Sequence, residues 1–293
     1  MSALEIVGKR QASWSTTAGR MKFRLEVARG WIFTLAIVGA IVATIASQSQ
    51  DRFRAYAAIV GAIMLGVGTL LTSRLGNATQ NSRWVRARAI AEALKREAFR
   101  FAAKASPYGG DNADSELSKA RERIEGGIDD DLAVLLIDVD RLGSTPTTTL
   151  SPAEYVEARV AAQIRFYRNA AGDSRRRASR LRTVEFLLAL AATVMTAVVG
   201  MLEKYPVPDL RFDFAALTAA ITTIGGLVLS HIESSRYDFL VMTYGAAARK
   251  LEQALSELDA TGANSQNWSA FVERCESIIA NENNSWIVKR MST

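Results

Sequence analysis

Four long stretches of the sequence contain no acidic or basic side chain, and this distribution constrains the fold more than any other feature. They are residues 30–50, 55–73, 186–202 and 214–232. All 36 basic and 30 acidic residues of the 293-residue chain lie outside them. A soluble fold mixes charged positions with core positions, whereas an uncharged apolar helix of roughly 20 residues is long enough to cross a bilayer. The sequence therefore predicts an all-α membrane protein with four transmembrane helices.

The spacing of the predicted spans groups them into two hairpins. Spans 31–47 and 55–73 are joined by seven residues, and spans 186–202 and 214–230 by eleven. Neither connection is long enough to hold a domain, so each pair of spans predicts a transmembrane helical hairpin. A cleaved signal-peptide core at 31–47, or a buried core helix, would explain one such run but not four runs in two matched pairs.

Lys and Arg residues are unevenly distributed around the two hairpins. Six precede the first span, seven lie in residues 74–100 and seven in residues 165–182, whereas each short connection holds two. Because the cytoplasmic flanks of membrane spans are enriched in Lys and Arg, both hairpins are predicted to have the same orientation. The N-terminus, the C-terminus and the whole of residues 74–185 are then cytoplasmic.

The part of the chain outside the spans is predicted to form a cytoplasmic helical bundle or stalk. Amphipathic spacing predicts helices over residues 82–104 and roughly 114–125. Apolar residues spaced four, three, four and three apart predict a further short helix. They are Ile128, Leu132, Leu135, Val139 and Leu142. The chain then divides into a first two-span helical module (1–105), a cytoplasmic helical linker (106–150) and a second two-span helical module (151–293).

Two more long helices are predicted in the second module. Ser151, Pro152 and Glu154 form the pattern of a capping box with proline at the first helical position, so one helix should run from there through the third span to Pro206. After the fourth span, residues 233–259 should continue as a helix until Thr261 and Gly262. A final helix should carry one apolar face, consisting of Trp268, Val272, Cys275, Ile279 and Trp286.

Several short patterns resemble the SLATT family, which comprises two-span bacterial membrane modules also labelled as domains of unknown function. In the first half the pattern runs from Trp84 to Phe101 after the hairpin. In the second half it includes Arg165-Phe166-Tyr167-Arg168, Tyr244 with residues 246–252, and Trp268-x-x-Phe271-Val272-x-x-Cys275-Glu276 followed by Asn281-Glu282 and Trp286. The resemblance implies tandem two-span modules in the bacterial cytoplasmic (inner) membrane. It also implies a role as membrane-perforating effectors of bacterial conflict and antiphage systems, beside nucleotide-signalling enzymes.

Small and hydroxyl-bearing side chains recur at helical spacing in every span. Small side chains let membrane helices pack closely, so packing within and between the hairpins is one interpretation of this pattern. The alternative is that hydroxyl groups line a narrow pore once several copies assemble. The pore-lining candidates are Thr69, Ser73, Thr193, Thr196, Thr223 and Ser230.

Charged residues gather at the cytoplasmic edge of the third span. Glu185 could pair with a neighbouring arginine, or a ring of Glu185 copies could attract cations at a pore mouth. The adjacent basic cluster is predicted to fix topology and to contact anionic lipid headgroups, with a nucleotide phosphate as the alternative ligand. It consists of Arg175, Arg176, Arg177, Arg180 and Arg182. His231, at the end of the fourth span, is expected to be an interfacial side chain.

Composition and motifs argue against several other classes of protein. One histidine and one cysteine cannot form a zinc site or an intramolecular disulfide. The sequence contains no phosphate-binding loop, dinucleotide fingerprint or nucleophile elbow, so we expect no enzyme activity, no catalytic residue and no cofactor. Residues 138–143 resemble the start of a calcium loop, but Leu142 and Thr149 occupy positions that need oxygen ligands or Glu.

The sequence therefore predicts an oligomeric membrane pore or channel-like effector that is gated through its cytoplasmic helices. Its expected partners are anionic lipid headgroups, further copies of the same chain, and a cytoplasmic sensor or nucleotide signal, with no nucleic acid. The alternative is a non-conducting membrane scaffold that anchors a soluble partner through its cytoplasmic helices.

Overall fold

The computed structural model describes residues 1–49, 51–75, 78–205, 207, 212–262 and 265–291. The side chains of residues 51, 72–81, 261, 265–266 and 284–291 lie outside this description. The chain divides into two compact units, and each unit contains residues from both halves of the sequence. The hairpin unit comprises Leu25–Gly76 and Gly172–Val241, and the bundle unit comprises Met1–Arg24, Asn77–Ala171 and Met242–Thr293. Each unit contains parts of both two-span modules predicted from the sequence. The boundaries predicted for the two modules and the linker stay a prediction.

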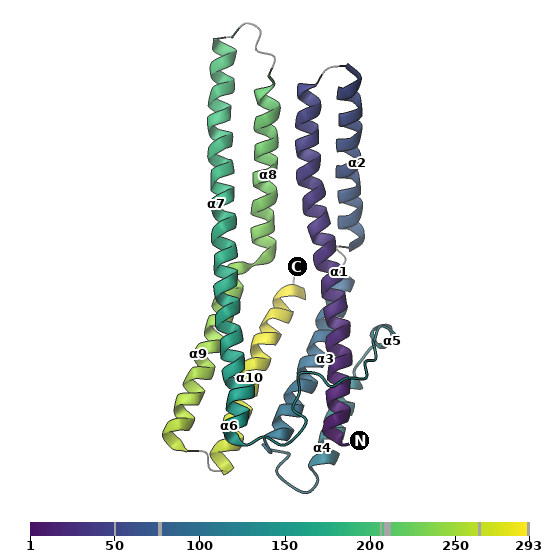
Figure 1. Ribbon diagram of the computed structural model, residues 1–293, viewed down its shortest axis with the longest axis vertical. Helices are drawn as coiled ribbons and strands as arrows, with labels where there is room; N and C mark the ends of the chain where they lie inside the picture. Colours follow the sequence, from purple (N-terminus) through teal and green to yellow (C-terminus); the bar gives the residue numbers. More distant parts are fainter. Residues whose placement is uncertain (50, 76–77, 206, 208–211, 263–264, 292–293) are drawn as a thin grey trace. The chain divides into compact units, whose positions relative to one another are not determined.

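The hairpin unit contains all four predicted spans, each within a helix. The helices are α1 (Ala3–Gln48), α2 (Asp51–Leu75), α7 (Ala162–Lys204) and α8 (Phe214–Ser235). Each is part of a helical stretch long and apolar enough to cross a membrane. Figure 1 shows α1 and α2 as one antiparallel pair and α7 and α8 as another. No strand occurs among the described residues. The predicted all-α fold with two helical hairpins is confirmed.

The two hairpins of this unit point the same way. The side-chain amide of Gln48, at the end of α1, donates to the carbonyl oxygen of Asp213 at 2.8 Å, and the Asp213 amide donates back to Gln48 Oε1 at 2.8 Å. The Asp213 side chain also caps α8 by accepting from Ala216 N. This reciprocal pair joins the first short connection to the second, so both connections lie at the same end of the unit.

Glycines allow α1 and α2 to approach closely. A Cβ added at Gly39 would lie 3.2 Å from Leu65 Cδ2, and one at Gly61 would lie 3.6 Å from Ala43 N. The outward faces of the unit carry large apolar side chains, including Ile63 (59% exposed) and Phe186 (62% exposed). Such continuous apolar exposure is expected of a surface that faces lipid.

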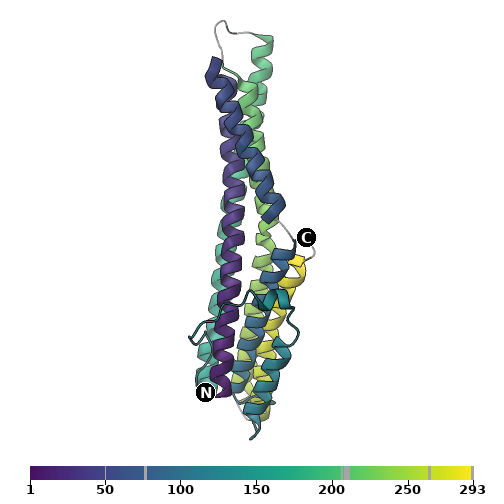
Figure 2. The ribbon, with the colours of Figure 1, turned by 90° about the vertical axis from the view of Figure 1, so that its right-hand side faces the viewer.

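The bundle unit packs four helical segments around an aromatic core. They are α3 (Ala78–Ala102), the first part of α7 with the preceding α6 (Pro152–Tyr155), α9 (Tyr237–Thr261), and α10 (Ser265–Met291). The helix α4 (Ala113–Glu125) packs against α3, which also packs against α10 (Figures 1 and 2). Tyr155 and Val272 are fully buried in this core, and Trp268 Nε1 donates to the Ala103 carbonyl at 2.9 Å.

Local signals in the second module placed its helices correctly. The Ser151 hydroxyl accepts from Glu154 N while the Glu154 carboxylate accepts from Ser151 N, so the predicted capping box is present. A π-helical turn, η1 (Val156–Ala161), links α6 to α7. The helix after the fourth span is interrupted at Arg236, which adopts a left-handed conformation (φ 50°) between α8 and α9. The predicted buried face of α10 includes Trp268, Val272, Cys275 and Ile279, while the Trp286 side chain lies outside the described residues.

The helix predicted from the spacing of Ile128 to Leu142 is wrong. Only α5 (Asp130–Ala133) is helical there, and residues 137–145, which we call the strap, run irregularly along α1. The strap donates backbone hydrogen bonds from Ile137 N to Thr17 Oγ1 at 3.0 Å and from Val139 N to Ser13 Oγ at 3.2 Å. These N–H groups are therefore satisfied by α1 and need no helical partner.

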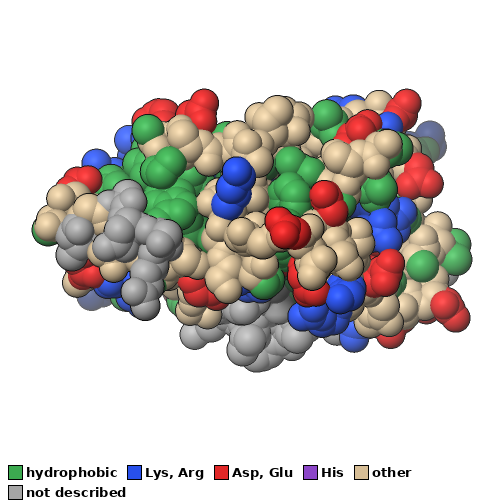
Figure 3. All heavy atoms as spheres, turned by 90° about the horizontal axis from the view of Figure 1, so that it is seen from below, with side chains coloured by type: hydrophobic (Ala, Val, Ile, Leu, Met, Phe, Trp, Pro, Cys, Tyr) green, Lys and Arg blue, Asp and Glu red, His purple; other side chains and the backbone are tan. Residues whose placement is uncertain are grey.

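The surface of the bundle unit has the mixed character expected of a face in water. Figure 3, the view from below, shows acidic and basic side chains distributed around hydrophobic ones. Lys9 pairs with Asp140 at 2.7 Å, and Arg168 with Glu252 at 2.7 Å. Because both signs of charge are interspersed, this surface differs from the uncharged faces of the hairpin unit.

Candidate functional site

A groove between α7 and α8 brings two of the predicted pore-lining residues together. Thr196 and Thr223 both line it, and its volume is about 520 Å³. The other lining residues are Val199, Ala215, Thr218, Ala219 and Thr222. Within the hairpin unit this groove therefore combines hydroxyl groups with small apolar side chains and contains no charged group among its lining residues.

The threonine hydroxyls of the groove use their hydrogens within their own helices. Thr196 Oγ1 donates to the Ala192 carbonyl at 2.8 Å, and Thr223 Oγ1 donates to the Ala219 carbonyl at 2.8 Å. Thr218 and Thr222 donate in the same way to the carbonyls of the residues four positions earlier. A hydroxyl that donates to its own helix keeps its oxygen lone pairs as acceptors. The groove can therefore accept hydrogen bonds or coordinate a cation.

The remaining pore-lining candidates do not line this groove. Thr193 of α7 and Thr69 of α2 are exposed, and each donates to the carbonyl four residues earlier in its helix. Ser230 is exposed near the end of α8, and the Ser73 side chain lies outside the described residues. Their roles stay predictions.

Sequence reasoning missed Thr218 and Thr222. The small residues that recur at helical spacing on α8 include Ala219 and Thr223. Thr218 and Thr222 each lie one position before one of these, so they occupy the neighbouring row of the same helix face. A prediction that took both neighbouring rows of α8 as pore-lining would have included Thr218 and Thr222.

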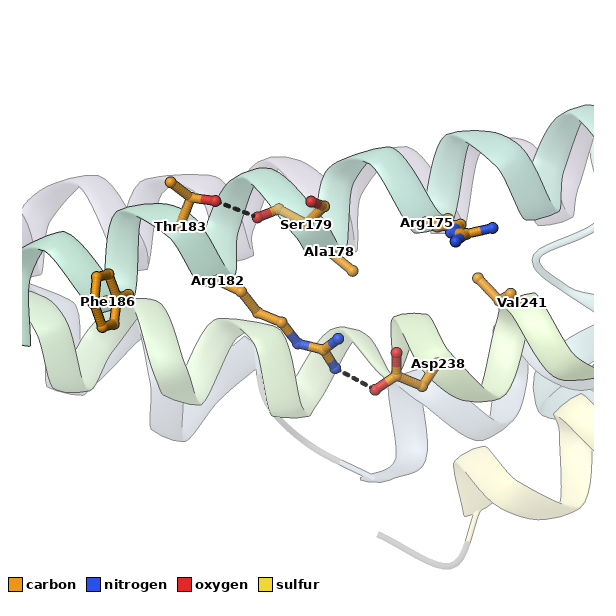
Figure 4. Close-up of a pocket in the computed structure, with 8 residues that line it drawn as sticks. All are labelled: Arg175, Ala178, Ser179, Arg182, Thr183, Phe186, Asp238 and Val241. Atoms are coloured by element: carbon orange, nitrogen blue, oxygen red, sulfur yellow. Dashed lines mark hydrogen bonds and ion pairs between the residues drawn. The ribbon is translucent and has the colours of Figure 1, made fainter.

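The basic cluster lies at the start of the membrane-spanning part of α7, and two of its five arginines line one pocket. Arg175 and Arg182 lie on one face of α7, opposite Asp238 and Val241 of α9 (Figure 4). Arg182 pairs with Asp238, and Arg176 pairs with Asp173 at 2.6 Å. Arg177 and Arg180 are exposed. No sequence signal links Arg182 with Asp238, because the two are 56 positions apart.

Glu185 is half-buried and lines an adjoining pocket with Glu233 and Arg236, and this pocket shares Arg182 and Asp238 with the first. Among the described residues, no arginine of the basic cluster forms an ion pair with Glu185. Arg182 pairs with Asp238 of α9, and the pairing of Glu185 with the cluster stays a prediction. The role of Glu185 at a pore mouth also stays a prediction. The His231 ring lies 5.2 Å from the ring of Phe33, centroid to centroid.

A buried ion pair lies at the centre of the bundle unit. Arg159, in the π-helical turn η1, donates from Nε and Nη2 to the two carboxylate oxygens of Glu276 at 2.8 and 2.7 Å. The Tyr155 hydroxyl donates to the same carboxylate at 3.0 Å, and the Arg159 guanidinium lies 4.6 Å from the centroid of the Phe99 ring. Burial, with the Glu276 charge, raises the pKa of Tyr155. Burial disfavours the charge on Arg159, but Glu276 more than offsets this and raises the pKa of the guanidinium.

The pKa values of two other buried acids in the bundle unit are shifted in opposite directions. Burial, supported by the negative charge of Glu92 and opposed by Arg88, raises the pKa of Glu282 to about 7. Burial also acts to raise the pKa of Glu97, but the Tyr108 hydroxyl at 2.6 Å and the charges of Arg100 and Arg96 bring it below its usual value. Glu282 is thus a carboxyl group whose pKa lies near neutrality.

Cys275 is buried, and burial raises the pKa of its thiol to about 12. A thiol that stays protonated at neutral pH is a poor nucleophile and a poor metal ligand. Within the described residues, no group of three or more potential metal ligands occurs.

Comparison with known proteins identifies the second half of the chain. Residues 155–286 match a family model described as SMODS and SLOG-associating 2TM effector domain 1, or SLATT_1. Residues 12–116 match a model described as a protein of unknown function, DUF4231. No curated protein and no solved structure matches the chain. The SLATT match begins at Tyr155, in the core of the bundle unit, and includes both helices of the second hairpin. Residues 155–286 are therefore similar to the SLATT family of two-transmembrane effector domains.

Proposed function

We propose that the protein is an oligomeric, channel-like effector of the bacterial cytoplasmic membrane. The observation that carries this proposal is the groove where Thr196 and Thr223 meet, because its oxygen lone pairs lie on an otherwise apolar face. Such lone pairs suit the wall of a pore, where they can contact water or ions. The groove of one chain does not enclose a channel, so several copies must turn their grooves toward a common axis.

The same proposal assigns gating to the cytoplasmic helices. Helix α7 contributes residues 162–171 to the bundle unit and residues 172–204 to the hairpin unit. A change in the packing around Arg159 and Glu276 would therefore act on the helix that also carries Thr196. In this model the N-terminus, the C-terminus and the bundle unit are in the cytoplasm.

The family description supports a trigger that comes from a partner. SLATT_1 domains are described as associating with SMODS and SLOG. By analogy, a cytoplasmic sensor or nucleotide signal would open the assembly of this protein in bacterial conflict, including defence against phage. The chain would act by permeabilising the membrane and would catalyse no reaction itself.

Ion flux from liposomes that contain the purified full-length chain tests the proposal. We expect flux that increases with protein density, and we expect Thr196→Val with Thr223→Val to reduce it several-fold, since Val replaces each hydroxyl with a methyl group of similar size. Thr69→Val removes a hydroxyl outside the groove and serves as the matched control. Tight vesicles at every protein density, or equal effects of the test and control variants, would contradict a pore at this groove.

A second candidate function, a non-conducting scaffold, is favoured by exposed apolar side chains around the strap. Val134 is 84% exposed, and Leu135 and Leu142 are 40% and 41% exposed. A deletion of residues 262–293 could not test the scaffold function, because α10 supplies core side chains such as Phe271 and Val272 and its loss would disturb the fold. Val134→Ser with Leu142→Ser should instead abolish recovery of a soluble partner and leave flux unchanged if the protein is a scaffold.

A further inference from the structure

We call the pocket at the start of the membrane-spanning part of α7 the neck pocket. Ion pairs within the protein do not neutralise all of its positive charge. Its charged lining residues are Arg175, Arg182 and Asp238, which together carry one net positive charge. Arg182 pairs with Asp238, whereas no ion pair or hydrogen bond of Arg175 occurs within the described residues. The pocket therefore presents one uncompensated guanidinium.

Polar groups of the neck pocket add a donor to this charge. The Thr183 hydroxyl donates to the Ser179 carbonyl at 3.0 Å, so its hydrogen is already used. The Ser179 hydroxyl lines the same pocket and has no such bond among the described residues (Figure 4). An anion with several acceptor oxygens could therefore receive hydrogen bonds from Ser179 and from the arginines, as phosphate groups do.

The Arg182–Asp238 pair does not close the pocket to an anion. The side chains of Arg182 and Asp238 are 55% and 67% exposed, and ion pairs exposed to this degree contribute little to stability. Figure 4 shows Arg182 turned toward Asp238 and Arg175 at the opposite end of the pocket from Phe186. A ligand phosphate could thus share or replace the Asp238 carboxylate as the partner of Arg182.

Position along α7 favours a lipid as the source of the phosphate. Phe186 lines the pocket and begins the charge-free run of the third span, and Arg182 precedes it by four residues, or about 6 Å of helix. The headgroup layer on each side of a bilayer is roughly 5–7 Å thick. Arg182 therefore lies at headgroup depth when Phe186 lies at the edge of the hydrocarbon.

We propose that the neck pocket binds the phosphodiester headgroup of an anionic glycerophospholipid. Arg182 and the Ser179 hydroxyl hold the phosphate, and the exposed ring of Phe186 contacts an acyl chain. Arg175, about two helical turns further from Phe186 than Arg182, adds a positive charge at the other end of the pocket. The pocket volume of about 580 Å³ lies within the range of small-molecule sites. The single net positive charge matches the single negative charge of a phosphodiester. This site requires the membrane location of the hairpin unit but does not require that the protein conducts.

Calorimetric titration of the full chain in neutral detergent tests the proposal with dihexanoylphosphatidylglycerol as the probe. We expect Arg175→Gln to weaken binding several-fold, because it removes the unpaired positive charge from the pocket. Arg177→Gln removes the same charge two residues away, outside the pocket, and should leave the affinity within about twofold. An equal loss in both variants would overturn the proposal, because general attraction to a basic surface would then explain binding.

A second pair of variants removes a negative charge instead of a positive one. Asp238→Asn releases Arg182 and should tighten binding of the same probe several-fold. Asp173→Asn changes the net charge equally and releases Arg176, which does not line the pocket, so it should have little effect. A tighter complex with Asp173→Asn than with Asp238→Asn would contradict the assignment of Arg182.

Two further probes distinguish a lipid from a soluble phosphate. Glycerophosphoglycerol, the deacylated headgroup, and inorganic phosphate should bind more weakly than the lipid, and Phe186→Ser should reduce the preference for the lipid. If inorganic phosphate binds as tightly as the lipid, or if Phe186→Ser leaves the preference unchanged, the lipid assignment is wrong.

Discussion

Arg159 and Glu276 bury opposite charges in the core of the bundle unit. Their side chains are 3% and 1% exposed, and they meet through two hydrogen bonds. Removing two charges from water is costly, and only good geometry with further hydrogen bonds offsets that cost. Tyr155 supplies the additional donor. This arrangement makes the network sensitive to the loss of either partner.

Glu276→Gln should therefore destabilise the protein by about 3–5 kcal/mol, because it leaves the Arg159 charge buried without a counter-ion. The double variant Arg159→Met with Glu276→Leu should recover most of this loss, since both charges are gone. Denaturant unfolding in detergent, followed by tryptophan fluorescence, measures these free energies. The control is Arg165→Met, which breaks an exposed pair with Glu157 and should cost less than about 1 kcal/mol. A similar cost for Glu276→Gln and Arg165→Met would contradict the account of the core.

Glu282 should make the stability of the bundle unit depend on pH. Its pKa is about 7 in the folded chain and 4.5 in the reference state, so between these values the folded chain holds a proton that the unfolded chain has lost. Its contribution is fully present below about pH 4.5, falls as pH rises to about 7, and changes no further above that. The whole effect is up to about 3 kcal/mol.

Glu282→Gln should remove this contribution. Relative to the unmodified chain, the variant should gain stability as pH rises from 5 to 7.5, measured by unfolding at each pH. Glu97 has a lowered pKa and acts in the opposite direction in both proteins, so the difference between them isolates Glu282. Parallel pH profiles for the two proteins would show that Glu282 does not titrate in this range.

At the scale of elements, local signals predicted helices well and long-range pairing poorly. The charge-free runs, the capping box at Ser151 and the buried face of α10 all depend on near neighbours in sequence, and each predicted element is present. The strap differs because its backbone partners, Ser13 and Thr17, are more than 100 positions away. The Arg182–Asp238 pair was invisible in sequence for the same reason.

The strap should detach when its hydroxyl partners on α1 are removed. Ser13→Ala with Thr17→Val deprives two strap N–H groups of acceptors, and each unsatisfied group costs about 1–3 kcal/mol. Limited proteolysis should then cleave residues 137–145 faster than in the unmodified chain. Thr16→Ala removes only an exposed contact with Arg141 and serves as the control. Unchanged cleavage in the double variant would mean that other contacts hold the strap.

At the scale of the whole molecule, the main feature of the chain is that its charge-free runs and its amphipathic helices lie in different units. The four charge-free runs, with outward-facing apolar side chains, lie in the hairpin unit, and amphipathic helices with charges of both signs form the bundle unit. The family match to a two-transmembrane effector domain agrees with this separation. The Lys and Arg counts predict a direction, with the bundle unit in the cytoplasm and both short connections on the opposite side.

Thiol labelling in intact cells tests this arrangement most directly. Ser49→Cys and Val207→Cys place a thiol in each short connection, and Ser115→Cys places one on the exposed side of α4. Cys275 is buried, with a thiol pKa raised to about 12, so it should not react in the folded protein. A membrane-impermeant reagent should label positions 49 and 207 from outside the cell, and position 115 only after lysis. Labelling of position 115 in intact cells, or labelling of positions 49 and 207 from opposite sides, would contradict two parallel hairpins with a cytoplasmic bundle.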